Sequence, residues 1–137
     1  MIALDSSFLI AFFNEGDAHH ARAAPVMERL LDGEWGSGIL LDYVFAEVTT
    51  VLMARRDLAT ARRVGDLLLH SREIDLVPGW AVFEGGFEVF REQEAGALGF
   101  TDAAIVAVAR ERAAGLVATF DSDFRGIAGL TVVPDGG

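Results

Sequence analysis

Residues 1–13 read MIALDSSFLIAFF: an apolar segment of strand length, then a carboxylate, two hydroxyls and a second apolar run. A strand as apolar as residues 1–4 is expected to be buried on both faces, as in a parallel sheet. Asp5 then falls at the carboxyl end of that strand, which is the edge at which ligands bind in open α/β sheets. The segment therefore predicts a buried parallel strand that brings an acidic side chain to a ligand-binding edge.

The composition indicates one globular domain with a substantial hydrophobic core. The 137 residues are 52% hydrophobic, and we assign all of them, residues 1–137, to a single domain. The chain contains no cysteine, which excludes disulfides, thiolate metal sites and cysteine nucleophiles. We find neither a signal peptide nor an apolar run long enough to span a membrane, so we expect a cytoplasmic protein with no membrane partner.

The charge of the chain restricts its partners. The formal net charge is -10, and all 11 basic residues are arginines. A surface this acidic argues against broad, nonspecific binding of nucleic acid, which needs basic side chains. The charge is nevertheless compatible with a nucleic-acid enzyme in which metal ions and a few arginines neutralise phosphate locally.

Apolar patterning along the chain predicts strands that alternate with helices. The expected strands cover residues 1–4, 36–41, 74–77, 116–120 and 130–133. The expected helices begin at Ser6 or Ser7 and then cover residues 19–32, 42–56, 59–71, 80–92 and 101–114. This alternation implies right-handed crossovers and an α/β fold, a three-layer α/β/α sandwich with a mainly parallel central sheet of four to five strands.

A few single residues are given structural roles by their neighbours in the sequence. Asp17 and Thr101 are predicted to be the N-caps of the helices that follow them. Trp35 and Trp80 are interpreted as core residues, because large aromatic side chains are mostly buried in a domain of this size.

Two acidic residues follow apolar strands, and two more lie on the inward faces of helices. Asp121 directly follows an apolar strand, as Asp5 does. Glu47 and Asp102 have apolar residues three and four positions away, which puts them on the buried stripe of their helices. Each also has an ordinary explanation: the edge of the stripe for Glu47, a helix first turn for Asp102, and a strand-end Asx turn for Asp121. Asp123 is either a further acid of the same site or the cap of a turn.

The four acids together are more informative than any one of them. If both acid-bearing strands are central, then Asp5, Glu47, Asp102 and Asp121 can meet at the carboxyl edge of the sheet. Carboxylates crowded in this way repel by several kcal/mol, which raises some of their pKa values. A divalent cation removes the repulsion, and ligands that are all oxygen suit Mg²⁺, with Mn²⁺ as a substitute. Such a site suits phosphoryl chemistry, because the metal holds a phosphodiester oxygen and lowers the pKa of a bound water.

These acids occur in four short motifs, which are Leu4-Asp5-Ser6-Ser7, Phe45-Ala46-Glu47-Val48, Thr101-Asp102-Ala103 and Ala118-Thr119-Phe120-Asp121-Ser122-Asp123-Phe124. In this order, and over essentially the whole chain, they resemble the PIN-domain ribonucleases, specifically the small VapC-type toxins of bacterial toxin–antitoxin pairs. The resemblance implies a metal-dependent endoribonuclease in which Asp5, Glu47, Asp102 and Asp121 form the Mg²⁺ site. Within it, Asp123 would be an auxiliary acid, and Thr101 would orient water or phosphate or only cap its helix.

The same resemblance implies three partners: an RNA substrate, a second copy in a homodimer, and a cognate antitoxin whose C-terminal segment covers the site. Because the chain has no lysine, contacts with RNA would be made by arginines. Candidates are Arg22, Arg55, Arg56 and Arg91.

Other functions fit the sequence less well. A receiver-type signalling domain needs a lysine near its phosphate and an acidic pair, and this chain has neither. A haloacid-dehalogenase-type phosphatase needs a second aspartate where Ser7 stands. A PIN-like protein that binds RNA or protein without cleaving is the remaining alternative. His19, His20 and His70 have no metal-ligand spacing, and we interpret them as surface or partly buried structural residues.

Overall fold

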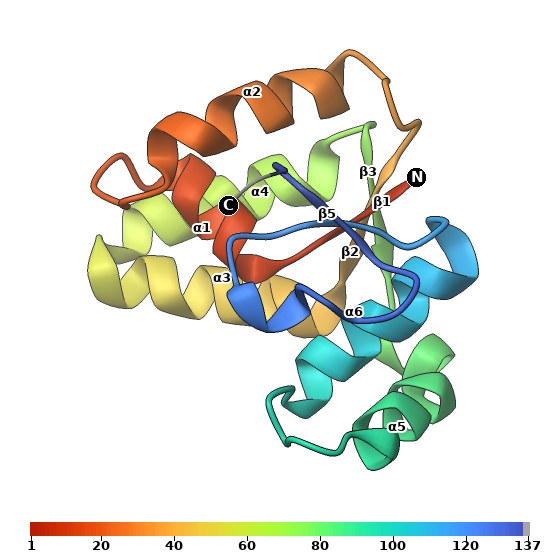
Figure 1. Cartoon of the computed structure of the whole chain (residues 1–137). Coiled ribbons are helices and arrows are strands. Elements are labelled where there is room, and N and C mark those ends of the chain that lie inside the picture. Colours follow the sequence, from red (N-terminus) through yellow and green to blue (C-terminus); the bar gives the residue numbers. More distant parts are fainter. Residues whose placement is uncertain (136–137) are drawn as a thin grey trace.

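The computed structural model describes residues 1–135, so the last two residues of the predicted domain, 136–137, lie outside the described part. Its centre is a five-stranded, all-parallel sheet with the order β3-β2-β1-β4-β5 (Figure 1). The strands are β1 (Ile2–Leu4), β2 (Gly38–Leu41), β3 (Ile74–Val77), β4 (Leu116–Ala118) and β5 (Thr131–Val133). The predicted parallel sheet is confirmed, and every observed strand falls within a predicted one.

The strand order puts β1 at the centre of the sheet and creates a change of direction beside it. The chain moves outward from β1 to β2 and β3, and then crosses back to β4 on the other side of β1. Ala3 pairs with Ile39 of β2 on one side and with Val117 of β4 on the other. In open α/β sheets, ligands bind outside the carboxyl edge at such a switch point, which here lies between β1 and β4.

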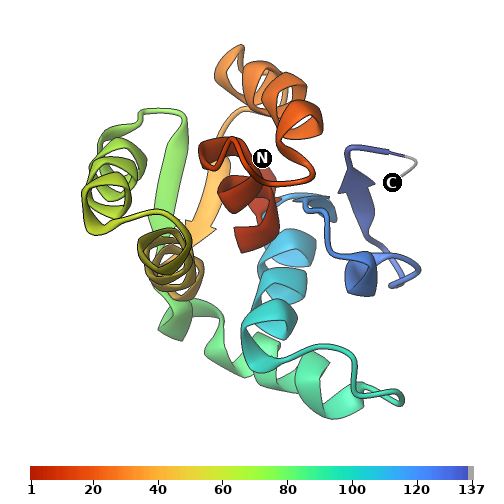
Figure 2. The same cartoon turned by 90° about the vertical axis from the view of Figure 1, so that its left-hand side faces the viewer.

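Helices cover both faces of the sheet (Figures 1 and 2). They are α1 (Ser6–Phe13), α2 (His20–Leu31), α3 (Asp42–Arg55), α4 (Leu58–His70), α5 (Phe83–Glu92) and α6 (Phe100–Arg112), with short 3₁₀ helices η1 (Gly79–Val82) and η2 (Ser122–Phe124). Because parallel crossovers are right-handed, α1 to α4 lie on one face and α5 and α6 on the other. The predicted three-layer α/β/α sandwich is thereby confirmed. Within residues 1–135, no helix is long and apolar enough to cross a membrane.

The centre of the core is formed by β1 and α6. All of β1 is buried, and so are residues 103–109 of α6, which include four alanines. The helix is buried on every side because β1 and β4 pack against it on one side and α5 on the other. This close packing fixes the first turn of α6 beside the carboxyl end of β1.

Two predicted helix caps are each wrong by two residues. The N-cap of α2 is His19, while Asp17 accepts the backbone N–H of His19 through Oδ1 at 2.8 Å and so caps the preceding turn. The N-cap of α6 is Gly99, whose extended backbone precedes the first helical residue. Thr101 therefore lies inside the first turn of α6, and its side chain is half-buried.

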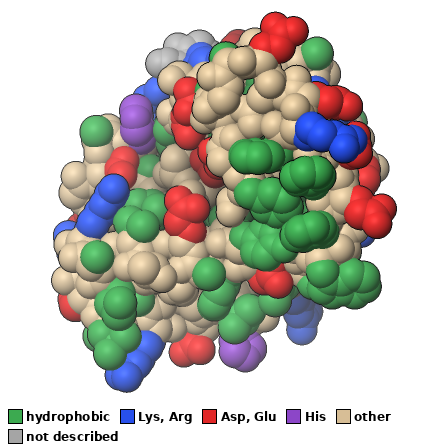
Figure 3. Space-filling view, turned by 90° about the horizontal axis from the view of Figure 1, so that it is seen from below, with side chains coloured by type: hydrophobic (Ala, Val, Ile, Leu, Met, Phe, Trp, Pro, Cys, Tyr) green, Lys and Arg blue, Asp and Glu red, His purple; other side chains and the backbone are tan. Residues whose placement is uncertain are grey.

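One predicted core residue lies on the surface. Trp80 on η1 is 78% exposed, whereas Trp35 packs against the core as predicted. The predicted helix 80–92 is divided into η1 and α5, and α5 exposes Phe83, Phe87 and Phe90 beside Trp80 in sequence. We call these four residues the aromatic face. The view from below (Figure 3) shows hydrophobic side chains gathered in one patch at the end of the molecule where α5 lies.

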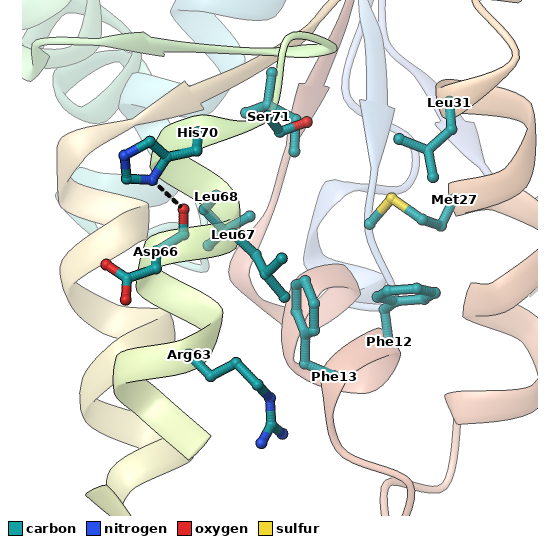
Figure 4. Close-up of a pocket in the computed structure, with 11 residues that line it drawn as sticks. Phe12, Phe13, Met27, Leu31, Arg63, Asp66, Leu67, Leu68, His70 and Ser71 are labelled. Atoms are coloured by element: carbon teal, nitrogen blue, oxygen red, sulfur yellow. Dashed lines mark hydrogen bonds between the residues drawn. The ribbon is translucent and has the colours of Figure 1, made fainter. Parts of the chain in front are cut away.

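A second apolar feature is a cavity of about 840 Å³ between α1, α2 and α4 (Figure 4). Phe12 and Phe13, from the end of α1, lie between Met27 on α2 and Leu67 on α4. Leu31 and Leu67 are 49% and 53% exposed at its edge. We call this feature the apolar cavity; it lies away from the carboxyl ends of β1 and β4.

Candidate active site

A polar pocket of about 580 Å³ lies at the carboxyl edge of the sheet, beside the switch point between β1 and β4. Asp5, Glu47, Asp102 and Asp121 all line this acidic pocket. They come from four separate elements: the residue after β1, the middle of α3, the first turn of α6 and the residue before η2. The parallel sheet thus brings together four acids that are far apart in the sequence.

The carboxylate of Asp5 is buried and held by two hydroxyl groups. Its side chain is 3% exposed, and its Oδ2 accepts hydrogen bonds from Ser7 Oγ at 2.6 Å and Thr119 Oγ1 at 2.7 Å. The same hydroxyls accept the backbone N–H groups of Phe120 and Asp121, both at 2.9 Å. Burial raises the pKa of Asp5, and the two hydroxyl donors oppose that rise because they stabilise the ionised form. This network fastens the end of β1 to the end of β4.

Asp102 experiences the negative charge of the pocket most strongly. Partial burial raises its pKa to about 7, and repulsion from Asp5, Asp121, Glu47 and Asp123 contributes to that rise. Among the residues described, none of these acids forms a salt bridge with an arginine or histidine. The pocket therefore holds an excess of negative charge that no basic side chain of residues 1–135 neutralises by direct pairing.

The remaining predicted residues are placed less deeply. Glu47 is exposed rather than buried on the inward stripe, because it lies at the edge of the stripe, where it accepts a hydrogen bond from Ser6 Oγ at 2.9 Å. Asp121 accepts the N–H of Asp123 at 2.9 Å, so it forms the Asx turn as well as lining the pocket. Asp123 is exposed and does not line the pocket, whereas Thr101 does line it.

The oxygen ligands of the pocket fit a hard divalent cation, although the four acids are not packed into one cluster. Within residues 1–135, no three acidic or histidine side chains stand close enough to form a ready metal site. The close cluster expected from the sequence is therefore replaced by acids spread around the pocket wall. Mg²⁺ commonly uses one or two protein carboxylates and keeps several waters, so a pocket with spread acids still offers the kind of ligand that this ion uses. The raised pKa of Asp102 shows the uncompensated charge that such a cation would neutralise.

Sequence reasoning missed the two hydroxyl groups that hold Asp5. Ser7 and Thr119 each lie two residues from a strand-end acid, Ser7 after Asp5 and Thr119 before Asp121. That shared spacing is the signal from which their role could have been found. Sequence reasoning did propose Arg55 for RNA contacts, and this arginine lines the acidic pocket.

Comparisons with known proteins agree with this geometry. Residues 2–130 match the family model described as the PIN domain. A search of curated proteins finds no significant match. Among solved structures, VapC20 of Mycobacterium tuberculosis, described as a sarcin-ricin loop cleaving toxin, is similar with a TM-score of 0.76 and 26% identity, covering 90% of this chain and 92% of that chain.

Two other solved structures share the fold. One is a toxin-antitoxin complex from Klebsiella pneumoniae, with a TM-score of 0.66, 19% identity and 96% coverage of both chains. The other is VapBC2 from Rickettsia felis bound to a DNA fragment from their promoter, with a TM-score of 0.71, 19% identity and coverage of 96% of this chain and 97% of that chain. At these identities the likeness shows a common fold.

Proposed function

This chain belongs to the PIN-domain family and is VapC-like in structure, and from that premise we propose that it is an Mg²⁺-dependent endoribonuclease, the toxin of a type II toxin–antitoxin pair. The observation that carries the proposal is the acidic pocket at the switch point, where Asp102 has a pKa raised to about 7. A site of this kind serves a reaction in which a doubly charged cation offsets both the carboxylates and a phosphodiester. An RNA substrate would place its action in the cytoplasm.

We assign distinct roles to the residues of the pocket. Asp5 and Asp102 would be direct ligands, with Glu47 and Asp121 completing the acidic wall. A bound Mg²⁺, or Mn²⁺ in its place, would supply a water of lowered pKa and stabilise the leaving oxygen. Ser7 and Thr119 keep the Asp5 carboxylate in one orientation, and Thr101 offers a hydroxyl to water or phosphate. Asp123 is more distant and would act on the site only through its charge.

Cleavage of structured RNAs tests this proposal. The purified chain is incubated with RNA and Mn²⁺, in parallel with an EDTA control and with an Asp5→Asn variant. We expect products only from the unmodified chain with metal, because both controls remove the cation or its buried ligand. Cleavage that continues unchanged in both controls would refute the metal-dependent mechanism. Metal-independent RNA binding without any product would instead support a protein that acts by binding alone.

The antitoxin would occupy the apolar cavity as well as the acidic pocket. The cavity presents exposed Leu31 and Leu67 with Phe12 and Phe13 beneath them, which suits the apolar side chains of a partner segment. We expect Leu67→Glu to abolish the complex with the proposed cognate antitoxin, measured by co-purification. Leu69→Glu is the control, because Leu69 is equally exposed on α4 but does not line this cavity.

A second copy of the chain would pack on the aromatic face. At about 200 Å² for each aromatic side chain, the exposed fractions of its four residues amount to on the order of 450 Å² of apolar surface. That is more than half of the roughly 800 Å² that each partner buries in a stable complex. Light scattering after size exclusion tests this: we expect a dimer that Trp80→Ser combined with Phe87→Ser converts to a monomer.

A further inference from the structure

The rim of the acidic pocket carries a stack of two aromatic rings. The imidazole of His19 lies flat on the ring of Phe120, with 4.6 Å between ring centroids and 4° between ring planes. The guanidinium carbon of Arg22 lies 5.5 Å from the centre of the same Phe120 ring. His19 precedes α2 and Phe120 lies after β4, so the stack joins two segments that are far apart in the sequence.

The two adjacent histidines have different roles, although the sequence analysis interpreted both as structural. His20 Nδ1 forms a hydrogen bond with the carbonyl of Ala11 at 2.8 Å, which fastens the start of α2 to α1. In the described part of the chain, no hydrogen bond involves the imidazole of His19. The His19 side chain is exposed, so one face of its ring lies on Phe120 while the ring keeps area for another partner.

The position of this stack relates it to the acids. His19 and Phe120 both line the acidic pocket, and Phe120 directly precedes Asp121. Among the lining residues within 1–135, Arg55 is the only arginine, and it is held only by a long 3.9 Å contact with Asp17. The chain has a net charge of -10, yet this part of the rim offers both an aromatic surface and a positive charge beside the acids. A polyanion such as a nucleic-acid strand could use both.

We propose that the exposed face of His19, backed by Phe120, is a stacking platform for one nucleobase of single-stranded RNA, with Arg55 contacting a neighbouring phosphate. The inference rests on the proposed function and names how that same site holds its substrate. Stacking on aromatic rings suits unpaired bases of any sequence, since every base has a π-face. Arg55 would supply the local positive charge that the acidic surface otherwise lacks.

A binding measurement that separates base from backbone tests the platform. Fluorescein-labelled hexa-adenylate is compared with an abasic ribose-phosphate hexamer of equal length and charge, by fluorescence anisotropy with Ca²⁺ in place of Mg²⁺. A gel establishes that the oligonucleotides stay intact. Variants are His19→Ala, His19→Phe and Arg55→Ala. The matched controls are His70→Ala, an exposed histidine outside the pocket, and Arg72→Ala, an exposed arginine that does not line the pocket.

The expected results differ between the two kinds of contact. The unmodified chain should prefer adenylate over the abasic strand, and His19→Ala should lower that preference by roughly 5- to 100-fold, the usual effect of losing one base–aromatic stack. His19→Phe should keep the preference, since it keeps a ring on Phe120. Arg55→Ala should weaken both strands equally and reduce the salt dependence of binding, and the two controls should change neither.

Three outcomes overturn the platform: equal binding of both strands by the unmodified chain, no binding of either strand, or a preference that His19→Ala leaves intact. The last result would mean that the ring stack only fastens α2 to the loop after β4. Cleavage of RNA with Mn²⁺ is scored separately. A preference that depends on His19 without cleavage contradicts the ribonuclease proposal alone, whereas cleavage with an unchanged preference contradicts the platform alone.

Discussion

Replacing Asp102 by asparagine should stabilise the metal-free protein near neutral pH. The pKa of Asp102 is raised from 3.8 to about 7 in the folded chain by burial and by repulsion from the other acids of the pocket. An acid with a raised pKa favours the folded state while it is protonated. The contribution of Asp102 to the free energy of unfolding is complete below its pKa in the unfolded chain. This contribution is lost as the pH rises from about 4 to about 7. Above that range the ionised Asp102 costs stability, and Asp102→Asn removes the cost.

The size of the effect follows from that shift. About three pKa units correspond to roughly 4 kcal/mol, but Asp102 is only half-buried, so screening by water reduces this to about 1–2 kcal/mol. The variant also loses the favourable charge of Asp102 in the first turn of α6, about 0.5 kcal/mol. The net gain of about 1 kcal/mol raises Tm by about 3 °C at about pH 8. At about pH 5 the folded Asp102 is protonated but the unfolded chain is already largely ionised, so about a third of the gain in Tm, roughly 1 °C, should remain.

Thermal unfolding followed by circular dichroism, in EDTA at both pH values, measures this gain. Glu84→Gln is the matched control, because Glu84 is an exposed acid in the first turn of α5 and does not line the pocket. It should lose a few tenths of a kcal/mol at about pH 8 and gain nothing. A lower Tm for Asp102→Asn at about pH 8, or an equal gain at both pH values, would show that charge crowding does not act on Asp102.

Three further predictions concern a buried hydrogen bond, a glycine with positive φ and the proposed metal. Thr119→Val should lower the free energy of unfolding in urea by about 1–3 kcal/mol, because Thr119 is fully buried and donates to Asp5; a loss under about 0.5 kcal/mol would contradict this. Gly115→Ala should cost at least about 2 kcal/mol, since φ is 83° and an added Cβ would lie 1.9 Å from the Gly129 carbonyl oxygen. Gly126→Ala is the control, because φ is 78° but an added Cβ would meet no atom within 4 Å, and it should cost only about 1 kcal/mol. Equal losses of stability in the two variants would show that the Gly115 clash does not contribute. Mg²⁺ at about 10 mM should raise Tm of the unmodified chain but not of Asp5→Asn, and no rise in either would count against the metal site.

The sheet and the positions of the acids were predictable because they depend on local patterns. An apolar strand followed at once by Asp5 fixes both the strand and its carboxyl end. Asp121 is predicted to follow its strand directly, but β4 ends at Ala118, three residues earlier; parallel pairing of β1 with β4 nevertheless brings the two ends together. Glu47 and Asp102 follow from helical spacing, which gives the direction of a side chain. Helical spacing does not show how deeply a side chain is buried. Glu47 is exposed and Asp102 is half-buried, because the neighbouring helices cover the two positions differently.

The features that could not be predicted from the sequence depend on contacts between distant segments. Trp80 is exposed although aromatic residues usually belong to the core, because η1 interrupts the predicted helix and no described element covers that turn. Gly99 replaces Thr101 as the N-cap of α6, because the helix begins two residues earlier than the capping preference of threonine indicates. The stack of His19 on Phe120 joins residues a hundred positions apart, and no periodic pattern of either segment predicts it.

The fold treats the charges of the two principal acids of the pocket, Asp5 and Asp102, in different ways. Asp5 is the more deeply buried, yet two hydroxyl donors stabilise its charge, and the same hydroxyls hold the backbone after β4. Asp102 has no hydrogen-bond donor to its carboxylate within the described chain, and its pKa rises to about 7. The charge of Asp5 is therefore offset by neutral donors, while no donor within residues 1–135 offsets the charge of Asp102. The proposed cation would therefore have its largest effect at Asp102, where burial and repulsion from the other acids raise the pKa and no hydrogen-bond donor opposes that rise.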